Sequence, residues 1–311
     1  MKLAFCGTPE FAAASLEKLA ANFEVQLVVT QPDRPSGRGM EVAAPPVKRL
    51  AQSLSIPVIQ PQSIKNNPEF RAALERLAPD AIIVVAYGRI IPQWMLDLPR
   101  YGNINLHASL LPRYRGAAPI QWAIANGERT TGVTTMRIDA GLDTGPVLLR
   151  REVEILPGET SVELACRLRE SGAELLVATL NGLESGSVAA IPQDDVQATP
   201  APLLKREDGA VDFHRSAREI YNRFRGFQPW PGAYTIFRGA DVKITGMQVA
   251  NEESGGMAPG EIHTGGTRLL AGCGQGSTIE LLEVQPAGRR PVSGADFARG
   301  ARIQPGERFG A

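Results

Sequence analysis

The six residues 81–86 read A-I-I-V-V-A and place an apolar side chain at every consecutive position. Side chains of a β-strand alternate between the two faces of a sheet, so a run without alternation needs both faces covered. This is typical of a strand in a parallel sheet that has helices on both sides. The run therefore predicts an α/β layer structure.

The remainder of the first half supports this prediction. Short apolar runs at 3–5, 25–29, 58–59 and 103–106 alternate with helical patterns near 9–21, 45–54, 67–78 and 118–126. Thr8 stands where it would cap the first of these helices, with Pro9 at the first helical position. Strand–helix alternation of this kind predicts a doubly wound α/β domain.

The pattern changes after a long helix expected near 161–184. Residues 185–204 are polar and contain several prolines, as a linker does. Beyond them, one helix near 215–225 is followed by short strands with Gly-rich turns, which is typical of a small β-barrel or sandwich. We therefore expect a first domain at 1–189, a linker at 190–206 and a second domain at 207–311.

Composition limits the classes of partner. Lys and Arg together number 33, as do Asp and Glu, so the formal net charge is zero. This excludes a strongly basic RNA-binding protein, but not one that contacts RNA through a few placed arginines, for which the salt dependence of binding should be shallow. The three cysteines are far apart and form no C-x-x-C, so neither a disulfide framework nor a cysteine-ligated zinc is expected.

Targeting signals are also not expected from the sequence. No apolar run approaches the roughly 20 residues that a membrane-spanning helix needs. The N-terminus resembles neither a signal peptide nor a transit peptide. We therefore expect a cytoplasmic protein of bacterial type that does not enter a membrane.

Polar side chains are concentrated at one predicted strand. In the stretch 103–107, alternation places Asn103, Asn105 and His107 on one side of the strand. Polar groups on a buried strand are costly unless they are hydrogen-bonded or face a cleft at the strand end. Asp143 follows later, in the glycine-flanked turn G-L-D-T-G.

Each of these residues alone is as readily structural as functional, because a histidine can be satisfied in a core and an Asp or Asn can close a turn. Together they are more informative. An amide donor, an imidazole and a carboxylate can stabilise an oxyanion and move a proton. No Ser or Cys lies in a nucleophile-elbow pattern, so the combination favours acyl transfer without a covalent nucleophile.

Longer stretches of the sequence carry a specific pattern. Residues 109–120 read S-L-L-P-R-Y-R-G-A-A-P-I, and they lie between the N-x-H of Asn105 and His107 and the G-L-D-T-G turn. Supporting segments are F-C-G-T-P-E-F-A at 5–12, Q-P-D-R-P-S-G-R-G at 31–39, P-P-V-K-R-L-A at 45–51, V-V-A-Y-G at 84–88 and F-Q-P-W-P-G-A-Y-T at 227–235. On these residues the chain closely resembles the family of 10-formyltetrahydrofolate-dependent formyltransferases, over nearly its whole length.

The resemblance implies a fold and residue roles. The fold is a Rossmann-like formyltransferase domain followed by an OB-like β-barrel domain that contacts tRNA. The catalytic residues are Asn105, His107 and Asp143. The folate-contacting residues are Ser109, Leu110, Leu111, Pro112, Val85, Ala86, Tyr87 and Gly88. Arg34 and Arg38 belong to a loop that enters the acceptor end of a tRNA. No metal ion is implied.

The resemblance also implies an activity. It is the transfer of a formyl group from 10-formyltetrahydrofolate to the α-amino group of methionine on initiator Met-tRNA, in translation initiation, by a monomer. Two alternatives stay open. Amino-sugar-nucleotide formyltransferases and formyltetrahydrofolate hydrolase-type domains share the Asn/His/Asp core, and a non-catalytic RNA-binding protein could use an OB-like domain.

Overall fold

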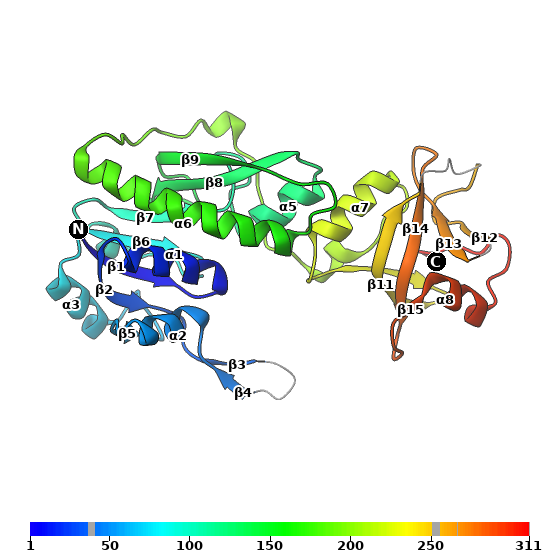
Figure 1. Cartoon of the computed structure of the whole chain (residues 1–311), viewed down its shortest axis with the longest axis horizontal. Coiled ribbons are helices and arrows are strands. Elements are labelled where there is room, and N and C mark those ends of the chain that lie inside the picture. Colours follow the sequence, from blue (N-terminus) through cyan, green and yellow to red (C-terminus); the bar gives the residue numbers. More distant parts are fainter. Residues whose placement is uncertain (37–40, 251–255, 266, 311) are drawn as a thin grey trace. The chain divides into compact units, whose positions relative to one another are not determined.

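The computed structural model describes residues 1–36, 41–250, 256–265 and 267–310. The chain divides into two units (Figure 1). The N-terminal unit comprises Met1–Pro119, Thr130–Glu154 and Leu164–Pro202, and the C-terminal unit comprises Ile120–Arg129, Ile155–Glu163 and Leu203–Ala311. Two short segments that come before residue 164 thus group with the C-terminal unit, which the sequence pattern does not indicate. The domain boundaries expected at 189 and 206 stay a prediction.

A seven-stranded sheet forms the centre of the N-terminal unit, in the order β5-β2-β1-β6-β7-β8-β9. Its strands are β1 (Lys2–Gly7), β2 (Glu24–Val29), β5 (Val58–Ile59), β6 (Ala81–Val85), β7 (Asn103–His107), β8 (Thr130–Arg137) and β9 (Val147–Glu154). The first five in this order pair in parallel, and β8 and β9 pair antiparallel. All five residues of β6 are buried, as the continuous apolar run predicts. The predicted α/β class is confirmed.

Helices cover both faces of this sheet. On one face lie α3 (Pro68–Leu77) and α4 (Gln93–Leu96), where Phe70 and Leu74 pack in one cluster with Cys6 and Val84. The other face carries α1 (Glu10–Ala20), α2 (Pro46–Ser53) and α6 (Ser161–Ser185), and Figure 1 shows α1 and α6 in front of the strands. Both faces of β6 are therefore dry, which explains its lack of alternation.

The start of α1 differs from the sequence prediction. The helix begins at Glu10, and the residue at its N-cap position is Pro9, which makes no side-chain cap. Thr8 lies one position too early to cap, so that prediction is wrong. Its hydroxyl instead donates a 3.3 Å hydrogen bond to the carbonyl oxygen of Tyr87, joining the ends of β1 and β6.

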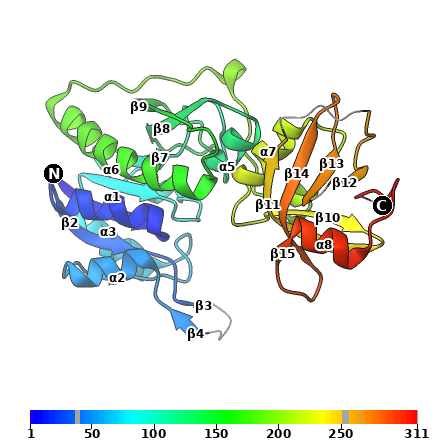
Figure 2. The same ribbon diagram turned by 45° about the vertical axis from the view of Figure 1, so that its right-hand side comes forward.

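A short hairpin leaves the N-terminal unit after β2. Its strands β3 (Arg34–Ser36) and β4 (Glu41–Ala43) pair antiparallel, where the sequence pattern predicts no strand. Figures 1 and 2 show it extending away from the α/β layers, beyond α2.

The C-terminal unit contains an antiparallel sheet in the order β10-β11-β14-β13-β12, with β15 pairing to β14. Its strands are β10 (Ala233–Phe237), β11 (Ala240–Val249), β12 (Ile262–Gly265), β13 (Arg268–Gly272), β14 (Thr278–Pro286) and β15 (Val292–Ser293). Its helices are α7 (Ala217–Gly226) and α8 (Gly294–Ala301), with most of α5 (Pro119–Ala125) and the short η2 (Arg206–Gly209). The predicted β domain is confirmed, although α8 is not foreseen.

The core of the C-terminal unit lies between its sheet and these helices. Ile220 of α7 and Phe297 of α8 belong to one cluster with Ile244 and Leu281 of the sheet. Ser216 caps α7 in a box with Glu219, each side chain bonding the other's backbone nitrogen. Nowhere in the described ranges is a helix both long enough and apolar enough to cross a membrane.

Candidate active site

His107 and Asp143 form the centre of the candidate site. Nδ1 of His107, at the end of β7, lies 3.6 Å from Oδ2 of Asp143, which stands in the turn between β8 and β9. The two side chains are only 7% and 15% exposed. A separation of 3.6 Å is too long for a direct hydrogen bond but short enough for strong Coulomb attraction once the imidazole is charged. The structure thus brings together two of the three residues predicted to be catalytic.

The turn that carries Asp143 needs its glycines. Asp143 itself has a left-handed backbone, with φ of 53°. A Cβ on Gly145 would lie 1.8 Å from the carbonyl oxygen of Arg137, so only glycine fits there. Asp139 closes the turn from inside, because its carboxylate accepts hydrogen bonds from Gly141 N and from the Thr144 hydroxyl. This packing accounts for the G-L-D-T-G pattern.

The other ring nitrogen of His107 is held by the loop after β7. Nε2 lies 2.8 Å from the carbonyl oxygen of Tyr114. A carbonyl oxygen can only accept, so Nε2 carries the proton. In the neutral ring Nδ1 is then unprotonated and faces Asp143. Nδ1 is therefore the nitrogen that can accept a proton.

Asn105 lies on the same side of β7 as His107, two residues earlier, and is half-buried. Among the described residues its side-chain amide has no protein hydrogen-bond partner. Asn103 differs, because its amide donates to the carbonyl oxygens of Met95 and Leu96 in α4. Of the two asparagines, Asn105 is therefore the one able to donate to a ligand.

The S-L-L-P loop follows His107 directly. Ser109 is fully buried, and its hydroxyl donates a 2.6 Å hydrogen bond to the carbonyl oxygen of Arg113. Leu111 is 1% exposed and packs against Met136 and Val147. The side chains of Ser109 and Leu111 therefore stabilise the loop and are not free to contact a ligand. Leu110 and Pro112 are half-buried and leave part of their surface open.

The predicted folate-contacting residues at the end of β6 are likewise part buried and part exposed. Val85 is 0% and Tyr87 2% exposed, whereas Ala86 and Gly88 are exposed with positive φ of 46° and 76°. Burial raises the pKa of the Tyr87 hydroxyl, which keeps its proton. The exposed parts of this segment are thus mainly backbone.

The sequence reasoning misses residues that support the site. Thr134 in β8 accepts a hydrogen bond from Leu111 N and donates one to Ser109 O. Gly116 donates its backbone N–H to Oδ2 of Asp143 over 2.9 Å. Gln193, in the stretch interpreted as a linker, donates to the backbone of the Asp143 turn. The R-G-A-A-P-I pattern could have indicated Gly116; no sequence signal indicates Gln193.

Arg34 and Arg38 belong to the β3–β4 hairpin. Arg34 is exposed at the start of β3, and Arg38 lies outside the described residues. The neighbouring Asp33 does not balance them, because it pairs with Lys48 at 2.6 Å and accepts a hydrogen bond from Gln60. These two hydrogen bonds hold the pKa of Asp33 below its ordinary value. Asp33 is therefore paired outside the hairpin, whose own residues 34–43 contain two arginines and one glutamate.

Helical spacing over 215–225 places Arg215 and Arg225 on the face opposite Ile220 and Phe224, which predicts that both are exposed. Arg215 is exposed and pairs with Asp212 at 3.5 Å. Arg225 contradicts the expectation: it is 7% exposed and donates to Asn222 Oδ1 and to the carbonyl oxygen of Glu159. The segment 155–163 packs against this side of the helix, which the helical period cannot reveal.

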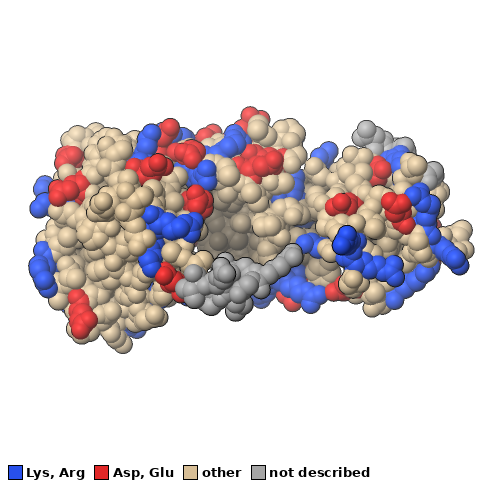
Figure 3. All heavy atoms as spheres, turned by 60° about the horizontal axis from the view of Figure 1, so that its bottom comes forward, with Lys and Arg blue, Asp and Glu red and all other residues tan. Residues whose placement is uncertain are grey.

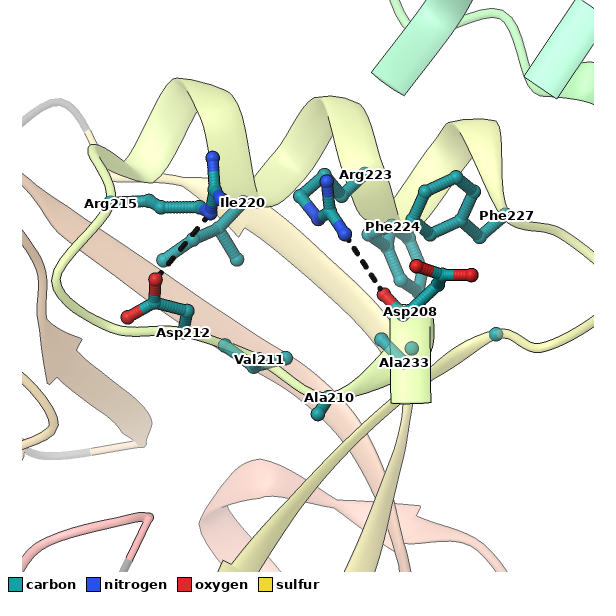
Figure 4. A pocket seen from close by; sticks show the side chains of 12 residues that line it. Asp208, Ala210, Val211, Asp212, Arg215, Ile220, Arg223, Phe224, Phe227 and Ala233 are labelled. Atoms are coloured by element: carbon teal, nitrogen blue, oxygen red, sulfur yellow. Dashed lines mark hydrogen bonds and ion pairs between the residues drawn. The ribbon is translucent and has the colours of Figure 1, made fainter. Parts of the chain in front are cut away.

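A small cavity lies beside α7, with a volume of about 10 Å³ (Figure 4). That is at the lower limit for holding one water molecule. Arg223 borders it and donates to the carbonyl oxygen of Asp208, and its guanidinium lies 4.9 Å from the ring centre of Phe227. The cavity is therefore a packing feature rather than a site for a substrate.

Charge on the surface agrees with the neutral composition. Acidic and basic side chains are interspersed over the face shown in Figure 3. Among the described residues, no group of three or more His, Cys, Asp or Glu side chains could hold a metal ion.

Comparison with known proteins places these features in a family. Residues 1–180 match the formyl transferase family, and residues 203–302 match the formyl transferase C-terminal domain. The chain is 60% identical to the methionyl-tRNA formyltransferase of Acidobacterium capsulatum, covering 100% of both chains. It is 58% identical to that of Koribacter versatilis, covering 100% of this chain and 99% of the relative.

A solved structure shows the same fold at low identity. The N-formyltransferase from Helicobacter canadensis, in complex with folinic acid and dTDP-3-aminofucose, superposes with a TM-score of 0.68 at 19% identity, covering 92% of this chain and 99% of that one. At such identity the likeness concerns the fold alone. The family models and the full-length relatives together lead to the conclusion that the chain belongs to the formyl transferase family and, within it, to the methionyl-tRNA formyltransferases.

Proposed function

We propose that this chain transfers a formyl group from 10-formyltetrahydrofolate to the α-amino group of methionine on initiator Met-tRNA. The observation that carries the proposal is the 60% identity, over the full length, to a relative named for this activity. The paired His107 and Asp143, with Asn105 on the same strand face, supply a chemistry that suits it.

Asn105 is proposed to stabilise the oxyanion. Attack of an amine on the formyl carbon gives a tetrahedral centre whose oxygen carries negative charge. The Asn105 amide has no protein partner among the described residues, so it can donate to that oxygen without breaking an existing hydrogen bond. One such donor contributes about 3–4 kcal/mol to lowering a barrier of this type.

His107 is proposed to accept the proton of the attacking amine at Nδ1. The Tyr114 carbonyl holds the other ring proton on Nε2, so Nδ1 is the free base in the neutral ring. Asp143, 3.6 Å away, then stabilises the imidazolium as it forms. When the tetrahedral centre collapses, the bond from the formyl carbon to N10 of the folate breaks and the imidazolium returns its proton to N10, so that tetrahydrofolate leaves. The working unit is further proposed to be a monomer.

The exposed surface at the site is proposed to hold the folate. Backbone of Ala86 and Gly88 and the open sides of Leu110 and Pro112 are available for contacts, whereas the side chains of Ser109 and Leu111 act by shaping the loop. The positively charged hairpin with Arg34 and Arg38 is proposed to contact the tRNA.

A comparison of acceptors tests the proposal. The protein is incubated with 10-formyltetrahydrofolate and either Met-tRNA, an amino-sugar nucleotide or water alone. We expect formyl-Met-tRNA as the product. Formylation of the amino sugar, or release of formate without an acceptor, would instead identify one of the other family activities. Binding of tRNA with no formyl transfer to any acceptor would favour a non-catalytic RNA-binding protein.

A further inference from the structure

The segment after α6 crosses the N-terminal unit as a strap, which we define as residues 191–201. Figures 1 and 2 show it running back across this unit near β9. At one end Ile191 exchanges two 2.8 Å backbone hydrogen bonds with Val147. At the other end Arg115 donates to Thr199 O, and Ala201 N donates to Arg115 O. The strap is therefore attached at one end to the start of β9, directly after the Asp143 turn, and at the other end to the loop that follows β7.

Gln193 is the strap residue that reaches the Asp143 turn. Its Nε2 donates to the carbonyl oxygen of Asp143 over 2.8 Å and to that of Gly145 over 2.7 Å. Its Oε1 accepts two hydrogen bonds from Arg115, at 3.1 and 2.9 Å. Both amide protons and the amide oxygen are thus used, so the side chain has one orientation.

Arg115 holds Gln193 from the opposite side. Its side chain is 13% exposed, and it also pairs with Asp195 of the strap at 2.7 Å. The next residue, Gly116, donates its N–H to the Asp143 carboxylate. The loop 113–118 and the strap therefore hold the same catalytic turn from two directions, one through the carboxylate and one through the backbone.

The strap contacts the partner of His107 as well. The Thr199 hydroxyl accepts a 2.9 Å hydrogen bond from Tyr114 N, and the carbonyl oxygen of the same Tyr114 accepts the proton on His107 Nε2. The backbone partners of both members of the His–Asp pair are thereby fixed by one segment.

We propose that Gln193 is a positioning residue for the reaction, which sets the Asp143 carboxylate relative to His107 by clamping the backbone of its turn. This proposal rests on the proposed catalytic role of Asp143. The clamp matters because the distance between the Asp143 carboxylate and His107 must be kept. Asp143 has a left-handed backbone in an exposed turn and lies 3.6 Å from Nδ1. A displacement of about 1 Å at a reacting group can cost about 100-fold in rate.

Two substitutions of Gln193 separate its contacts. Gln193→Met keeps the size but removes the amide. Gln193→Glu keeps an acceptor for Arg115 but places a carboxylate against two carbonyl oxygens, so the clamp is lost while the link to Arg115 stays. Both should lower kcat about 10- to 100-fold, with the KM values for folate and Met-tRNA changed less than about threefold. Gln197→Met is the matched control, because Gln197 lies on the same strap and contacts only Asp194 there.

A double-mutant cycle identifies the route of the effect. In an Asp143→Asn background, Gln193→Met should lower kcat by less than about twofold further, because the carboxylate that it positions is already gone. Equal losses in both backgrounds would overturn the proposal, as would wild-type kcat in Gln193→Glu or an equal loss in Gln197→Met. If Gln193→Met does not fold, Gln193→Glu decides alone.

The cycle also separates the two proposals. Wild-type turnover in Asp143→Asn alone would contradict the catalytic role in the proposed function. A slow Asp143→Asn together with a fast Gln193→Met and Gln193→Glu would contradict only the positioning role.

Discussion

The backbone nitrogen of Gly116 donates a 2.9 Å hydrogen bond to Oδ2 of Asp143. The same oxygen faces Nδ1 of His107, so a peptide group and an imidazole share one carboxylate oxygen. Gly116 has φ of 125°, and a Cβ there would lie 2.6 Å from the carbonyl oxygen of Ala201. The donor to the Asp143 carboxylate is thus built into a position where any side chain other than that of glycine would be strained.

Gly116→Ala should therefore lower both stability and turnover. The left-handed backbone and the close approach to Ala201 cost about 2–3 kcal/mol of unfolding free energy, and relief of that strain moves the N–H away from Asp143. Thermal melting and single-turnover formyl transfer measure the two effects. Gly186→Ala is the control, because Gly186 also has a positive φ but no atom within 4 Å of its Cβ position. Gly186→Ala should lower the unfolding free energy by about 1 kcal/mol and leave turnover unchanged.

Asp143→Asn should lower kcat about 10²- to 10⁴-fold while the protein keeps its fold. Asparagine adopts a left-handed backbone readily, so the turn survives and only the charge is lost. Steady-state formylation of Met-tRNA measures kcat, and circular dichroism measures the fold. The exposed Asp97→Asn serves as the control for loss of one negative charge from the same unit. Similar kcat values for the two variants would remove the Asp143 charge from the mechanism.

Much of this site can be predicted from the sequence. Local pattern fails for those residues whose position depends on tertiary contacts. Alternation along 103–107 correctly places Asn105 and His107 on one side of a strand. Turn chemistry indicates an acidic group between glycines at Asp143, but no local pattern shows which end of the sheet the turn approaches. The role of Gln193 could not be predicted from the sequence at all. Its polar, Pro-bearing neighbours are typical of a linker, and only its hydrogen bonds to the backbone of the Asp143 turn distinguish it.

Arg38→Ala should weaken the use of Met-tRNA and leave folate binding unchanged. Removal of one phosphate contact should raise KM for Met-tRNA about tenfold. KM for Met-tRNA and the dissociation constant of the folate are measured separately. Arg71→Ala is the control, because Arg71 is an exposed arginine of α3 that pairs with Glu75.

The salt dependence of Met-tRNA binding provides a second measurement for the same hairpin. Two phosphate contacts, from Arg34 and Arg38, correspond to a log–log slope of about −2. A much steeper slope would show that a broader surface binds the tRNA. An equal loss of folate and tRNA affinity in Arg38→Ala would contradict its assignment to the tRNA.

Glu307 should stabilise the C-terminal unit in a pH-dependent way. Hydrogen bonds from the Arg238 side chain, at 2.7 and 2.8 Å, and from Gln304 N hold the pKa of Glu307 below its ordinary value. A lowered pKa in the folded state adds stability above the unfolded pKa of about 4.3, and this is lost as the pH falls through the folded value. Glu307→Gln should therefore melt earlier than wild type at pH 7, and the gap should close near pH 3.

Thermal melting across this pH range measures the gap. The control is Glu207→Gln, which removes the same charge from an exposed position in the same unit. A gap that is constant from pH 7 to pH 3 would mean that Glu307 acts by packing alone.

Thiol chemistry should distinguish the three cysteines. Burial raises the pKa of both Cys6 and Cys273 to about 12, whereas Cys166 is exposed on α6. The thiolate is the reactive form, so at pH 8 a disulfide reagent should label one thiol quickly in the native protein and three after denaturation. Rapid native labelling that persists in Cys166→Ser would show that one of the buried thiols is accessible.

In the fold, too, local sequence pattern predicts some features correctly and fails for others. The unbroken apolar run of β6 predicts a strand covered on both faces. All five of its residues are buried, and Phe70 and Leu74 pack in a hydrophobic cluster on one of its sides, which confirms the prediction. Arg225 shows the opposite case. Its position along α7 indicates solvent, yet the backbone of Glu159 covers it, because a segment far away in the sequence returns to that side.

The strap has a consequence for dividing the chain. A fragment that ends at residue 189 would contain Asn105, His107 and Asp143, but it would lack Gln193 and Thr199. Such a fragment would keep the sheet and lose its activity, because the backbone around the proposed catalytic pair would have no support from outside. A fragment made to retain activity should therefore extend at least to Pro202, and an exchange of C-terminal modules between relatives should join the chains after that residue.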